Sequence, residues 1–514
     1  MKTLPILEFA SCLLLVGAAV FFCDDYGSNW DEMVHSRYGN LVVEYFRSGL
    51  KDTACNEWVN MRFYGPLFEV IPSAIRPEGG DLYAIRHLWL ALLGVGVVAG
   101  AWCFARRLGP ICALVSALAL VAMPRFVGHA FHNSKDIPFA LTIAWFIVAW
   151  SRIVVTRDQR WRSYLLLGTA AGFVLCARPG GLPIVLAYMF GGLVLSDLTR
   201  DRAVPEPRLL PRLGVAFCVA WVLMVLPWPW AHENPLMNPI RAMGIAAAFD
   251  NVYPVLFDGT LTKSDALPRI YLPWYLSHAT PLPVLALAFV GLIAMVREQF
   301  TDFRGVRSRM FGLLELWIFA PIAMLVIVRP NIYDGLRHVL FVLPALAIMA
   351  GIGAVSVVRA SGRRARVPVA SVVLVLLAMP FRNHVQLHPY QSTYFNELAG
   401  GVGEAAAGYE TDYWATSFRE AMEWLDAHGG DRPMTFGVRG SWLVARAASY
   451  YAPPRFAALR GLKEDPTTWP AEVDAVISTT RAACLYGEGL SGWKVVHEVG
   501  RDGAVFAQVL RRVE

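Results

Sequence analysis

The sequence predicts a polytopic α-helical membrane protein with about eleven transmembrane helices and a small soluble α/β domain at its C-terminal end. Three observations lead to this fold class. Hydrophobic residues make up 56% of the 514 residues and charged residues only 17%, a more apolar composition than soluble domains have. Long apolar runs recur as far as residue 381, and arginines gather in alternate connections between them. Beyond residue 382 the apolar runs stop.

Eleven apolar runs are long enough, or nearly long enough, to cross the roughly 30 Å hydrocarbon core of a bilayer. We interpret the first as an uncleaved helix, because no small-residue cleavage site follows it in "CDDYGSNW". The runs are 5–23, 85–105, 109–124, 137–155, 163–177, 181–196, 213–230, 279–296, 310–328, 338–358 and 367–381.

Basic residues predict the orientation of these helices. They gather at Lys2 and in the alternate connections 106–107, 152–162, 200–212, 297–309 and 359–366. The positive-inside rule therefore predicts a cytoplasmic N-terminus. The exoplasmic side then receives 24–84, 125–136, 231–278, 329–337 and everything after 382. Because the net charge of +6 forms no basic stripe or tail, we expect no nucleic-acid partner.

We therefore divide the chain into a transmembrane domain, residues 1–382, and an exoplasmic domain, residues 383–514. In the second, "MTFGVRG", "EVDAVIST" and "WKVVHEVGRDGAVFAQVL" predict strands, and "SFREAMEWLDAHG" predicts a helix. In "YETDYWATS", Glu410, Asp412, Tyr413 and Trp414 lie near the membrane exit, where sugars stack on aromatic rings. A helix N-terminus with an interfacial Trp explains these residues better.

The first exoplasmic loop, 24–84, carries an acidic pair close to the membrane. Its apolar residues recur at helical spacing, Ser28 or Asn29 can cap the start, and Gly49 can end it, so we expect an interfacial amphipathic helix. Asp31 and Glu32 occupy its first turn. The helix dipole favours acidic residues there whatever the protein does, so the pair alone does not indicate a catalytic site.

Basic residues at the outer ends of other helices strengthen the functional interpretation. Each is costly at the edge of hydrocarbon unless it snorkels or is paired. Together they would surround a membrane-level cavity with donors suited to a lipid phosphate. A carboxylate beside such a cavity suits glycosyl transfer, although a phosphotransferase or a lipid transporter needs similar groups. These basic residues are Arg125, His129, Lys135, Arg178, Arg269, Arg329, Arg337 and His338.

Several motifs resemble one known superfamily. The pair in "SNWDEMVHSRYG" resembles the DE motif of the protein O-mannosyltransferases and the lipid A aminoarabinose transferases, the family 39-like branch of the GT-C superfamily. "GHAFHNSKDIPFA", "ARPGGLPIVLAY", "YLPWYLSHATPLPVLAL" and "RPNIYDGLRHVLFVLPALA" look like bacterial phospholipid-carrier-dependent glycosyltransferases. The resemblance covers nearly the whole membrane part. It implies an inverting enzyme that moves a sugar from a polyprenyl-phosphate carrier to an acceptor hydroxyl.

The resemblance also implies a place and partners. The reaction would run on the exoplasmic face of a bacterial cytoplasmic membrane, among membrane lipids, with a lipid, a glycan or a protein as acceptor. The predicted helix count is lower than in the aminoarabinose transferases, and the C-terminal domain is not the repeat domain of eukaryotic mannosyltransferases. The acceptor therefore stays open.

Roles for individual residues follow from the resemblance. Asp31 resembles the general base, Glu32 would position the acceptor or tune that base, and Asp136 matches the acidic residue at the outer end of the fourth span. Lys135, Arg178 and Arg337 are candidates for binding the carrier phosphate. Further candidates for binding the substrate are His35, Arg269, Tyr333 and His338.

Two alternatives accompany this interpretation. No metal is expected, although Asp31, Glu32 and Asp136 would offer oxygen ligands to a hard divalent cation. A transporter of lipid-linked sugars would also need charged groups, but near the midplane and often in repeated halves. The sequence shows no internal repeat, and its charges gather at one face.

Overall fold

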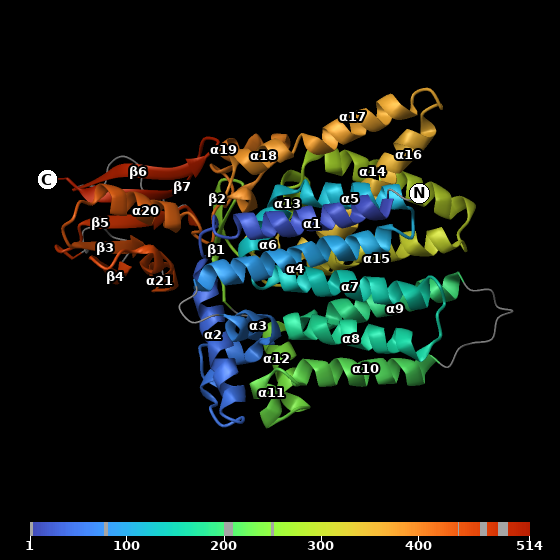
Figure 1. The fold of residues 1–514 in the computed structure, drawn as a ribbon, viewed down its shortest axis with the longest axis horizontal. Coiled ribbons are helices and arrows are strands. Elements are labelled where there is room, and N and C mark those ends of the chain that lie inside the picture. The colour runs from blue at the N-terminus through green and yellow to red at the C-terminus, as the bar shows by residue number, and fades with distance from the viewer. Residues whose placement is uncertain are drawn as a thin grey trace.

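A bundle of long helices carries a small sheet domain at one end (Figure 1). The structure is a computed structural model, and it describes residues 4–76, 81–199, 209–247, 251–439, 442–462, 470–481 and 492–513. Arg200, Arg202 and Arg208, part of one predicted cytoplasmic connection, lie outside these residues.

Each of the eleven predicted apolar runs lies on a helix. Within the described residues, seven helices are long and apolar enough to cross a membrane, or up to eight if one bent pair counts as a single span. The exact number of spans therefore stays a prediction. The helices are α1 (Leu4–Phe22), α4 (Leu82–Ala105), α5 (Pro110–Val121), α7 (Asp136–Val154), α8 (Trp161–Ala177), α9 (Leu182–Leu198), α10 (Leu209–Val225), α14 (Leu282–Thr301), α15 (Val306–Val328), α16 (Leu343–Ala360) and α17 (Arg366–Ala378).

The bent pair replaces part of a predicted loop with helix. α5 is followed by α6 (Pro124–His132), and the two are bent by 70°. Pro124 has no backbone N–H to continue α5, but it suits the first turn of a new helix. As a result, residues 125–132 of the predicted loop 125–136 are helical, and all of them except Val127 are buried.

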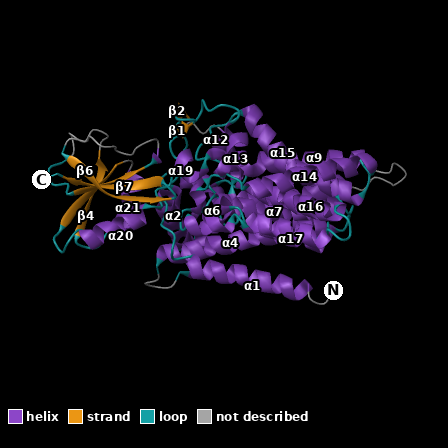
Figure 2. Cartoon of the chain, turned by 90° about the horizontal axis from the view of Figure 1, so that it is seen from above, coloured by secondary structure: helices purple, strands orange, loops and turns teal. Residues whose placement is uncertain are grey.

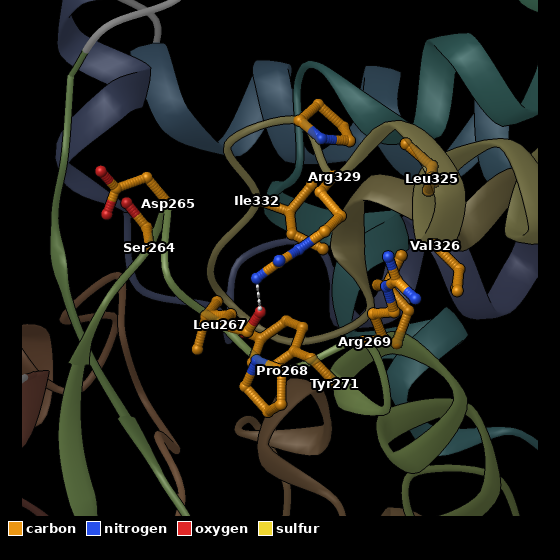
Figure 3. Close-up of a pocket in the computed structure, with 12 residues that line it drawn as sticks. Ser264, Asp265, Leu267, Pro268, Arg269, Tyr271, Leu325, Val326, Arg329 and Ile332 are labelled. Carbon is orange, nitrogen blue, oxygen red and sulfur yellow. Dashed lines mark hydrogen bonds between the residues drawn. The ribbon is translucent and has the colours of Figure 1, made fainter.

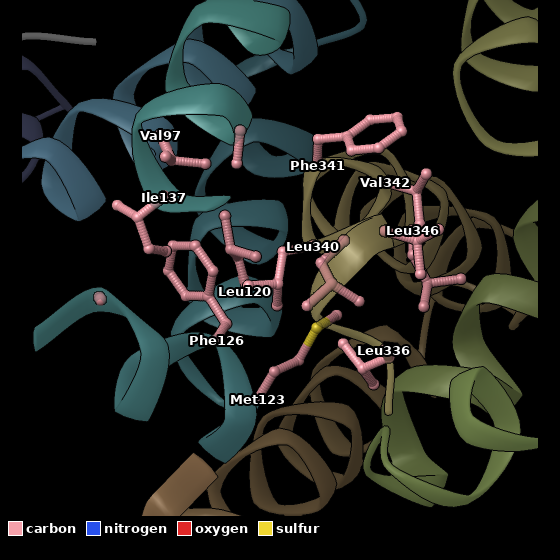
Figure 4. Packing of buried hydrophobic residues seen from close by; sticks show 14 of the residues in the cluster. Val97, Leu120, Met123, Phe126, Ile137, Leu336, Leu340, Phe341, Val342 and Leu346 are labelled. Atoms are coloured by element: carbon pink, nitrogen blue, oxygen red, sulfur yellow. The ribbon is translucent and has the colours of Figure 1, made fainter. Parts of the chain in front are cut away.

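Part of the bundle core packs where several helices begin or end. Figure 4 shows side chains of α4, α5, α6 and α7 meeting those of η4 (Arg337–Val342) and α16, among them Val97, Leu120 and Phe341. α14 and α16 approach each other at glycines, because a Cβ on Gly291 or Gly353 would collide with the backbone of the other helix. Small residues of this kind let membrane helices pack backbone to backbone.

A layer of short elements covers the end of the bundle that carries the sheet domain (Figure 1). The predicted amphipathic helix is present as α2 (Trp30–Arg47), which runs across the bundle end and stops two residues before Gly49. The other elements of this layer are η1 (Ala54–Asn56), η2 (Met61–Phe63), α3 (Leu67–Ile75), η3 (Pro179–Gly181), α11 (Pro229–Glu233), α12 (Met237–Ala247), β1 (Pro254–Phe257), β2 (Thr260–Lys263) and α13 (Tyr271–His278).

Within the described residues, the C-terminal sheet has five strands in the order β4-β3-β5-β7-β6. Figure 2 shows this sheet beside the helices of the bundle. β3 pairs in parallel with β4 and β5, whereas β7 pairs antiparallel with β5 and β6. The predicted strands and helix are confirmed as β3 (Met434–Arg439), β5 (Ala475–Thr479), β6 (Trp493–Arg501), β7 (Ala504–Arg512) and α20 (Phe418–His428). β4 (Phe456–Leu462) and α21 (Trp442–Tyr451) were not predicted.

Short segments join the bundle to the sheet domain. They are α18 (Phe381–Gln386), η5 (Gln391–Thr393), η6 (Glu397–Ala399) and α19 (Gly401–Ala405). α18 spans the predicted boundary at residue 382, which stays a prediction. The described start of α1 and the sheet lie at opposite ends of the molecule (Figure 1). The two ends thus suit opposite sides of a membrane, and which side is cytoplasmic stays a prediction.

Candidate active site

A cavity of about 280 Å³ lies where several helices end beneath the short elements. Lys135 precedes α7, Arg178 follows α8 and Arg337 begins η4, and all three side chains line this cavity. Tyr333 and His338 line it as well. Five residues predicted from three separate loops are therefore brought together.

The start of α2 is held by a capping box that positions Asp31. The Asn29 side chain accepts hydrogen bonds from the backbone N–H groups of Asp31 (2.9 Å) and Glu32 (3.0 Å). Glu32 Oε2 accepts in return from the backbone N–H of Asn29 at 3.0 Å. This exchange satisfies N–H groups that a helix start otherwise leaves unpaired. Asp31 is thereby fixed in the first turn, where the helix dipole favours its negative charge.

Asp31 is joined to the cavity through Lys135. Lys135 Nζ lies 3.4 Å from Asp31 Oδ2, and each side chain is 25% exposed. Burial alone would raise the pKa of Asp31, but the positive charges of Lys135, His35 and Arg337 together lower it below its ordinary value. Asp31 is therefore an ionised, accessible carboxylate at neutral pH.

Asp136 is less available than Asp31. Its side chain is 3% exposed and forms an ion pair with Arg178. Asn133 Nδ2 donates to Asp136 Oδ2 at 2.9 Å, and the Asp136 backbone N–H donates to Asn133 Oδ1 at 2.8 Å. With these contacts, Asp136 orients Arg178 toward the cavity and presents no free carboxylate to it.

Arg337 is held by an aspartate and two aromatic rings. Asp334 Oδ2 lies 3.0 Å from Arg337 Nη2, and both side chains are buried. The Arg337 guanidinium also lies over the rings of Tyr333, at 4.8 Å, and Trp414, at 5.1 Å. Such contacts fix the plane of a guanidinium and leave its other N–H groups to a ligand.

Glu32 and His35 do not line the cavity, and their predicted roles stay predictions. Glu32 is 0% exposed, and its Oε2 lies 3.1 Å from His87 Nε2 in α4. His35 Nδ1 lies 2.8 Å from Glu69 Oε1, and Arg86 Nη2 lies 2.5 Å from Glu69 Oε2. These side chains face the bundle and not the cavity. They form a buried network that joins α2 to α3 and α4.

Arg269 is also separate from the cavity. It lines a small pocket beside it together with Arg329, which donates from Nη2 to the Leu267 carbonyl at 3.1 Å (Figure 3). Arg269 itself is exposed. The loop from Leu267 to Tyr271 turns its side chain outward, so the position suits an interfacial cation that snorkels.

Arg125 and His129 lie deeper than the predicted loop position implies. Arg125 is buried, donates from Nε to the Tyr394 carbonyl at 2.7 Å and lies over the Phe395 ring at 4.5 Å. The Tyr413 hydroxyl lies 3.2 Å from His129 Nε2. These contacts join α6 to the segment that leads into the sheet domain.

Sequence reasoning missed several residues around the cavity. Asp334 follows the predicted Tyr333 in "RPNIYDGLRHVL", and its position three residues before Arg337 was the available signal. For Trp414 the sequence favours an interfacial role, whereas the structure places its ring against Arg337. Arg481, which donates to Asp334 Oδ1 at 2.9 Å, carries no local signal because the two are 147 positions apart. Tyr64 lies beneath Lys135, 5.5 Å from its Nζ.

The carboxylates of this site are paired with basic side chains. Within the described residues, no group of three or more His, Cys, Asp and Glu side chains could hold a metal ion. Asp31 contacts Lys135, Asp136 contacts Arg178, and Glu32 faces the buried network. That no metal takes part stays a prediction.

Comparisons with known proteins point to one fold. Residues 79–228 match the model of the family described as dolichyl-phosphate-mannose-protein mannosyltransferase. The chain superposes on ArnT from Cupriavidus metallidurans in the apo state with a TM-score of 0.54 at 16% identity, covering 98% of this chain and 97% of that one. ArnT bound to undecaprenyl phosphate gives a TM-score of 0.48 at 15% identity, with the same coverage.

A more distant likeness joins the chain to the arabinofuranosyltransferase AftD from Mycobacteria, with a TM-score of 0.40 at 14% identity, over 87% of this chain and 35% of that one. No curated protein matches the sequence. The predicted fold is thus confirmed: the chain is a multi-pass membrane protein with the GT-C fold of ArnT, and it is similar to the protein mannosyltransferases over residues 79–228.

Proposed function

We propose that the protein is an inverting glycosyltransferase that moves a sugar from a polyprenyl-phosphate carrier to an acceptor hydroxyl at the exoplasmic membrane face. One observation carries this proposal. Lys135, Arg178 and Arg337, which come from three different loops, line one cavity, and an ionised carboxylate lies 3.4 Å from the first of them. The similarity to a family described by its dolichyl-phosphate-mannose donor supports a polyprenyl-phosphate sugar.

The lining of the cavity suits a lipid phosphate. Two guanidiniums and one ammonium supply charge-assisted hydrogen bonds to phosphate oxygens. The remaining wall includes apolar side chains that suit the prenyl chain. They are Phe139, Ile184, Ile245, Leu325 and Phe341. A ligand with an anionic head and an apolar tail fits both parts, whereas a free nucleotide sugar would leave the apolar wall exposed to water.

The proposed reaction is a single displacement with Asp31 as general base. Asp31 accepts the proton of the acceptor hydroxyl while that oxygen attacks C1 of the sugar. The bond between C1 and the phosphate oxygen breaks, and its electron pair leaves on the phosphate. Lys135, Arg178 and Arg337 stabilise the charge that develops there. Attack opposite the leaving phosphate inverts the anomeric centre.

The Lys135–Asp31 contact suggests how the donor prepares the base. Without a donor, Lys135 neutralises Asp31 across 3.4 Å. A phosphate bound between Lys135 and the two guanidiniums would draw the ammonium toward itself and weaken its hold on Asp31. The base would then gain proton affinity at the moment the leaving group is in place. We therefore expect the donor to bind before the acceptor hydroxyl is deprotonated.

The acceptor, a lipid, a glycan or a protein, is not specified by these contacts. The test therefore follows the donor: cleavage of the lipid-linked sugar is measured, which does not require the acceptor to be known. Purified protein in lipid nanodiscs is incubated with a panel of polyprenyl-phosphate sugars and a membrane extract as acceptor source, and released polyprenyl phosphate is measured. Asp31→Asn serves as the inactive comparison, and Glu44→Gln, at an exposed position of the same helix, serves as the matched control.

Release of polyprenyl phosphate by the wild type and Glu44→Gln, but not by Asp31→Asn, is the expected result. Equal release by Asp31→Asn would remove the proposed base. A second preparation in sealed proteoliposomes tests the alternative: if the intact lipid-linked sugar crosses that bilayer and is never cleaved, the protein is a transporter of lipid-linked sugars and the proposal fails.

A further inference from the structure

The carboxylate of Asp334 is shared between two arginines from different domains. Its Oδ2 lies 3.0 Å from Arg337 Nη2, and its Oδ1 accepts from Arg481 Nη1 at 2.9 Å. Asp334 is 1% exposed and adopts a left-handed backbone conformation, with φ of 60°. Non-glycine residues adopt this conformation at a cost, and Asp tolerates it better than most. The loop thus holds this one side chain between both guanidiniums.

Arg481 belongs to the C-terminal sheet domain, where it lies two residues after β5 ends. Its Nη1 also donates to the Tyr413 carbonyl at 3.1 Å, and its guanidinium lies 4.9 Å from the Trp30 ring. Trp30 is the first residue of α2 and precedes Asp31. Arg481 therefore contacts both the segment that holds Arg337 and the start of the helix that carries Asp31.

The charges around Asp334 explain what a second arginine adds. If Asp334 paired with Arg337 alone, its negative charge would offset most of the attraction of Arg337 for an anion. Arg481 binds the other oxygen of that carboxylate. Arg337, Asp334 and Arg481 together therefore keep a net positive charge next to the cavity. In a site sheltered from water such a charge acts over several ångströms. The domain that lies outside the membrane thereby contributes to the electrostatics of the cavity.

We propose that Arg481 is a positioning residue of the donor site: through Asp334 it fixes Arg337 and preserves the positive charge that the carrier phosphate meets. The inference rests on the proposed function, because it assigns the ligand of Arg337 to a phosphate. It gives the C-terminal domain a part in donor binding. A purely structural contact between domains would predict a loss of stability with unchanged affinity in the protein that remains folded.

The experiment measures the affinity of purified, full-length protein for undecaprenyl phosphate, which supplies the phosphate without requiring the sugar to be known. Arg481→Met should raise the dissociation constant about tenfold, equivalent to 1.4 kcal/mol. Arg481→Lys keeps the charge but loses the fork, so it should restore part of that affinity. Arg455→Met removes another arginine of the sheet domain that pairs with an aspartate, Asp426, and should leave the affinity unchanged.

A double variant tests the route through Asp334. If Arg481 acts by way of this carboxylate, Arg481→Met should cost little further affinity once Asp334→Asn is present. Wild-type affinity in a folded Arg481→Met protein, or an equal loss in Arg455→Met, would overturn the inference and leave the proposed function standing. Failure of the wild type itself to bind undecaprenyl phosphate would overturn both.

Discussion

The first turn of α2 lies between two polar regions, and each receives one of two adjacent carboxylates. The comparison shows how the same kind of charge can be available to a ligand on one side and structural on the other. On the cavity side, Asp31 is 25% exposed and touches Lys135. On the bundle side, Glu32 is fully buried against His87 and the backbone of Asn29. Consecutive side chains on a helix point about 100° apart, since a turn takes 3.6 residues. Of the two adjacent carboxylates, Asp31 therefore lies beside a residue that lines the cavity, and Glu32 points into the protein interior.

The buried region behind α2 is suited to holding the helix in place. Glu69 bonds both His35 of α2 and Arg86 of α4, which ties three elements together. A buried ion pair adds little stability relative to apolar packing, but removing one partner leaves an uncompensated charge. The cavity region differs, because Lys135 and Arg178 are partly exposed there and a phosphate can reach them. We therefore expect substitutions in the cavity to change chemistry and substitutions behind α2 to change stability.

The largest effect should come from Asp31→Asn. Asparagine keeps the size and most of the hydrogen-bonding geometry but is far less basic, so turnover should fall roughly 10²-fold to 10⁴-fold, the usual contribution of a general base. Affinity for undecaprenyl phosphate should be kept. Turnover is measured as release of polyprenyl phosphate per folded molecule. If Glu32→Gln were to lower turnover per folded molecule as much as Asp31→Asn, the contrast between the two faces would be lost.

Glu69→Gln should act on stability and leave turnover per folded molecule nearly unchanged. Burial alone would raise the pKa of Glu69, but Arg86 and His35 lower it from 4.5 to about 2. A shift of that size corresponds to about 3 kcal/mol of unfolding free energy at neutral pH. Glu44→Gln removes an exposed pair on the same helix and should cost less than about 1 kcal/mol. Thermal unfolding in detergent compares the two.

The pH dependence of unfolding separates this charge effect from a packing defect. Since the folded pKa of Glu69 is depressed, its stabilisation is complete above 4.5 and is lost as the pH falls through about 2. The free energy of unfolding of the wild type should fall as the pH drops through that window. For Glu69→Gln it should be lower at neutral pH and should depend less on pH. Parallel curves for the two proteins would assign the lost stability to packing.

A smaller effect is expected from Arg337→Lys. Lysine keeps the charge but cannot donate through a planar fork, so affinity for undecaprenyl phosphate should fall about tenfold to a hundredfold, the range for one charge-assisted hydrogen bond. Arg329→Lys alters a neighbouring arginine that lines the small pocket and serves as the matched control. An equal loss in both variants would indicate a general effect of basic residues at the membrane surface.

Much of the architecture could be predicted because it depends on local patterns. The apolar runs predicted the helices of the bundle, and helical spacing predicted α2 in the first loop. The helix after the bend was missed, although Pro124 gave a signal, because Arg125, His129 and His132 make this stretch polar enough to resemble a loop. Composition alone cannot separate a polar loop from a short buried helix.

Part of the membership of the candidate site was predictable, but the pairing of its residues was not. Lys135, Arg178 and Arg337 were chosen because cations at helix ends are costly, a physical rule that needs no structure. The role of Glu32 could have been questioned, because Asn29 and Glu32 have the spacing of a capping box. The Glu69–Arg86 and Asp334–Arg481 pairs join distant segments, and only tertiary packing determines such partners.

The smallest expected change is a shift in the pH profile on removing Lys135. Burial raises the pKa of Asp31, and Lys135 is the leading charge that lowers it. Lys135→Met should therefore raise the pKa of Asp31, so the acid limb of the kcat/KM profile should move to higher pH. Lys135→Arg keeps a positive charge and should leave the limb near its wild-type position.

This shift distinguishes the two ways in which Lys135 can matter. If it only binds the carrier phosphate, Lys135→Met should raise the donor KM at every pH and leave the acid limb where it was. If Lys135 also contacts Asp31, the acid limb moves as well, because losing the neighbouring cation raises the pKa of Asp31. The profile of kcat/KM for the donor isolates the second effect, because it reports the ionisation of the enzyme before the donor binds. An unmoved acid limb in that profile would contradict the hold of Lys135 on Asp31. At saturating donor the acid limb of kcat should move less, because the phosphate has already drawn Lys135 away from Asp31.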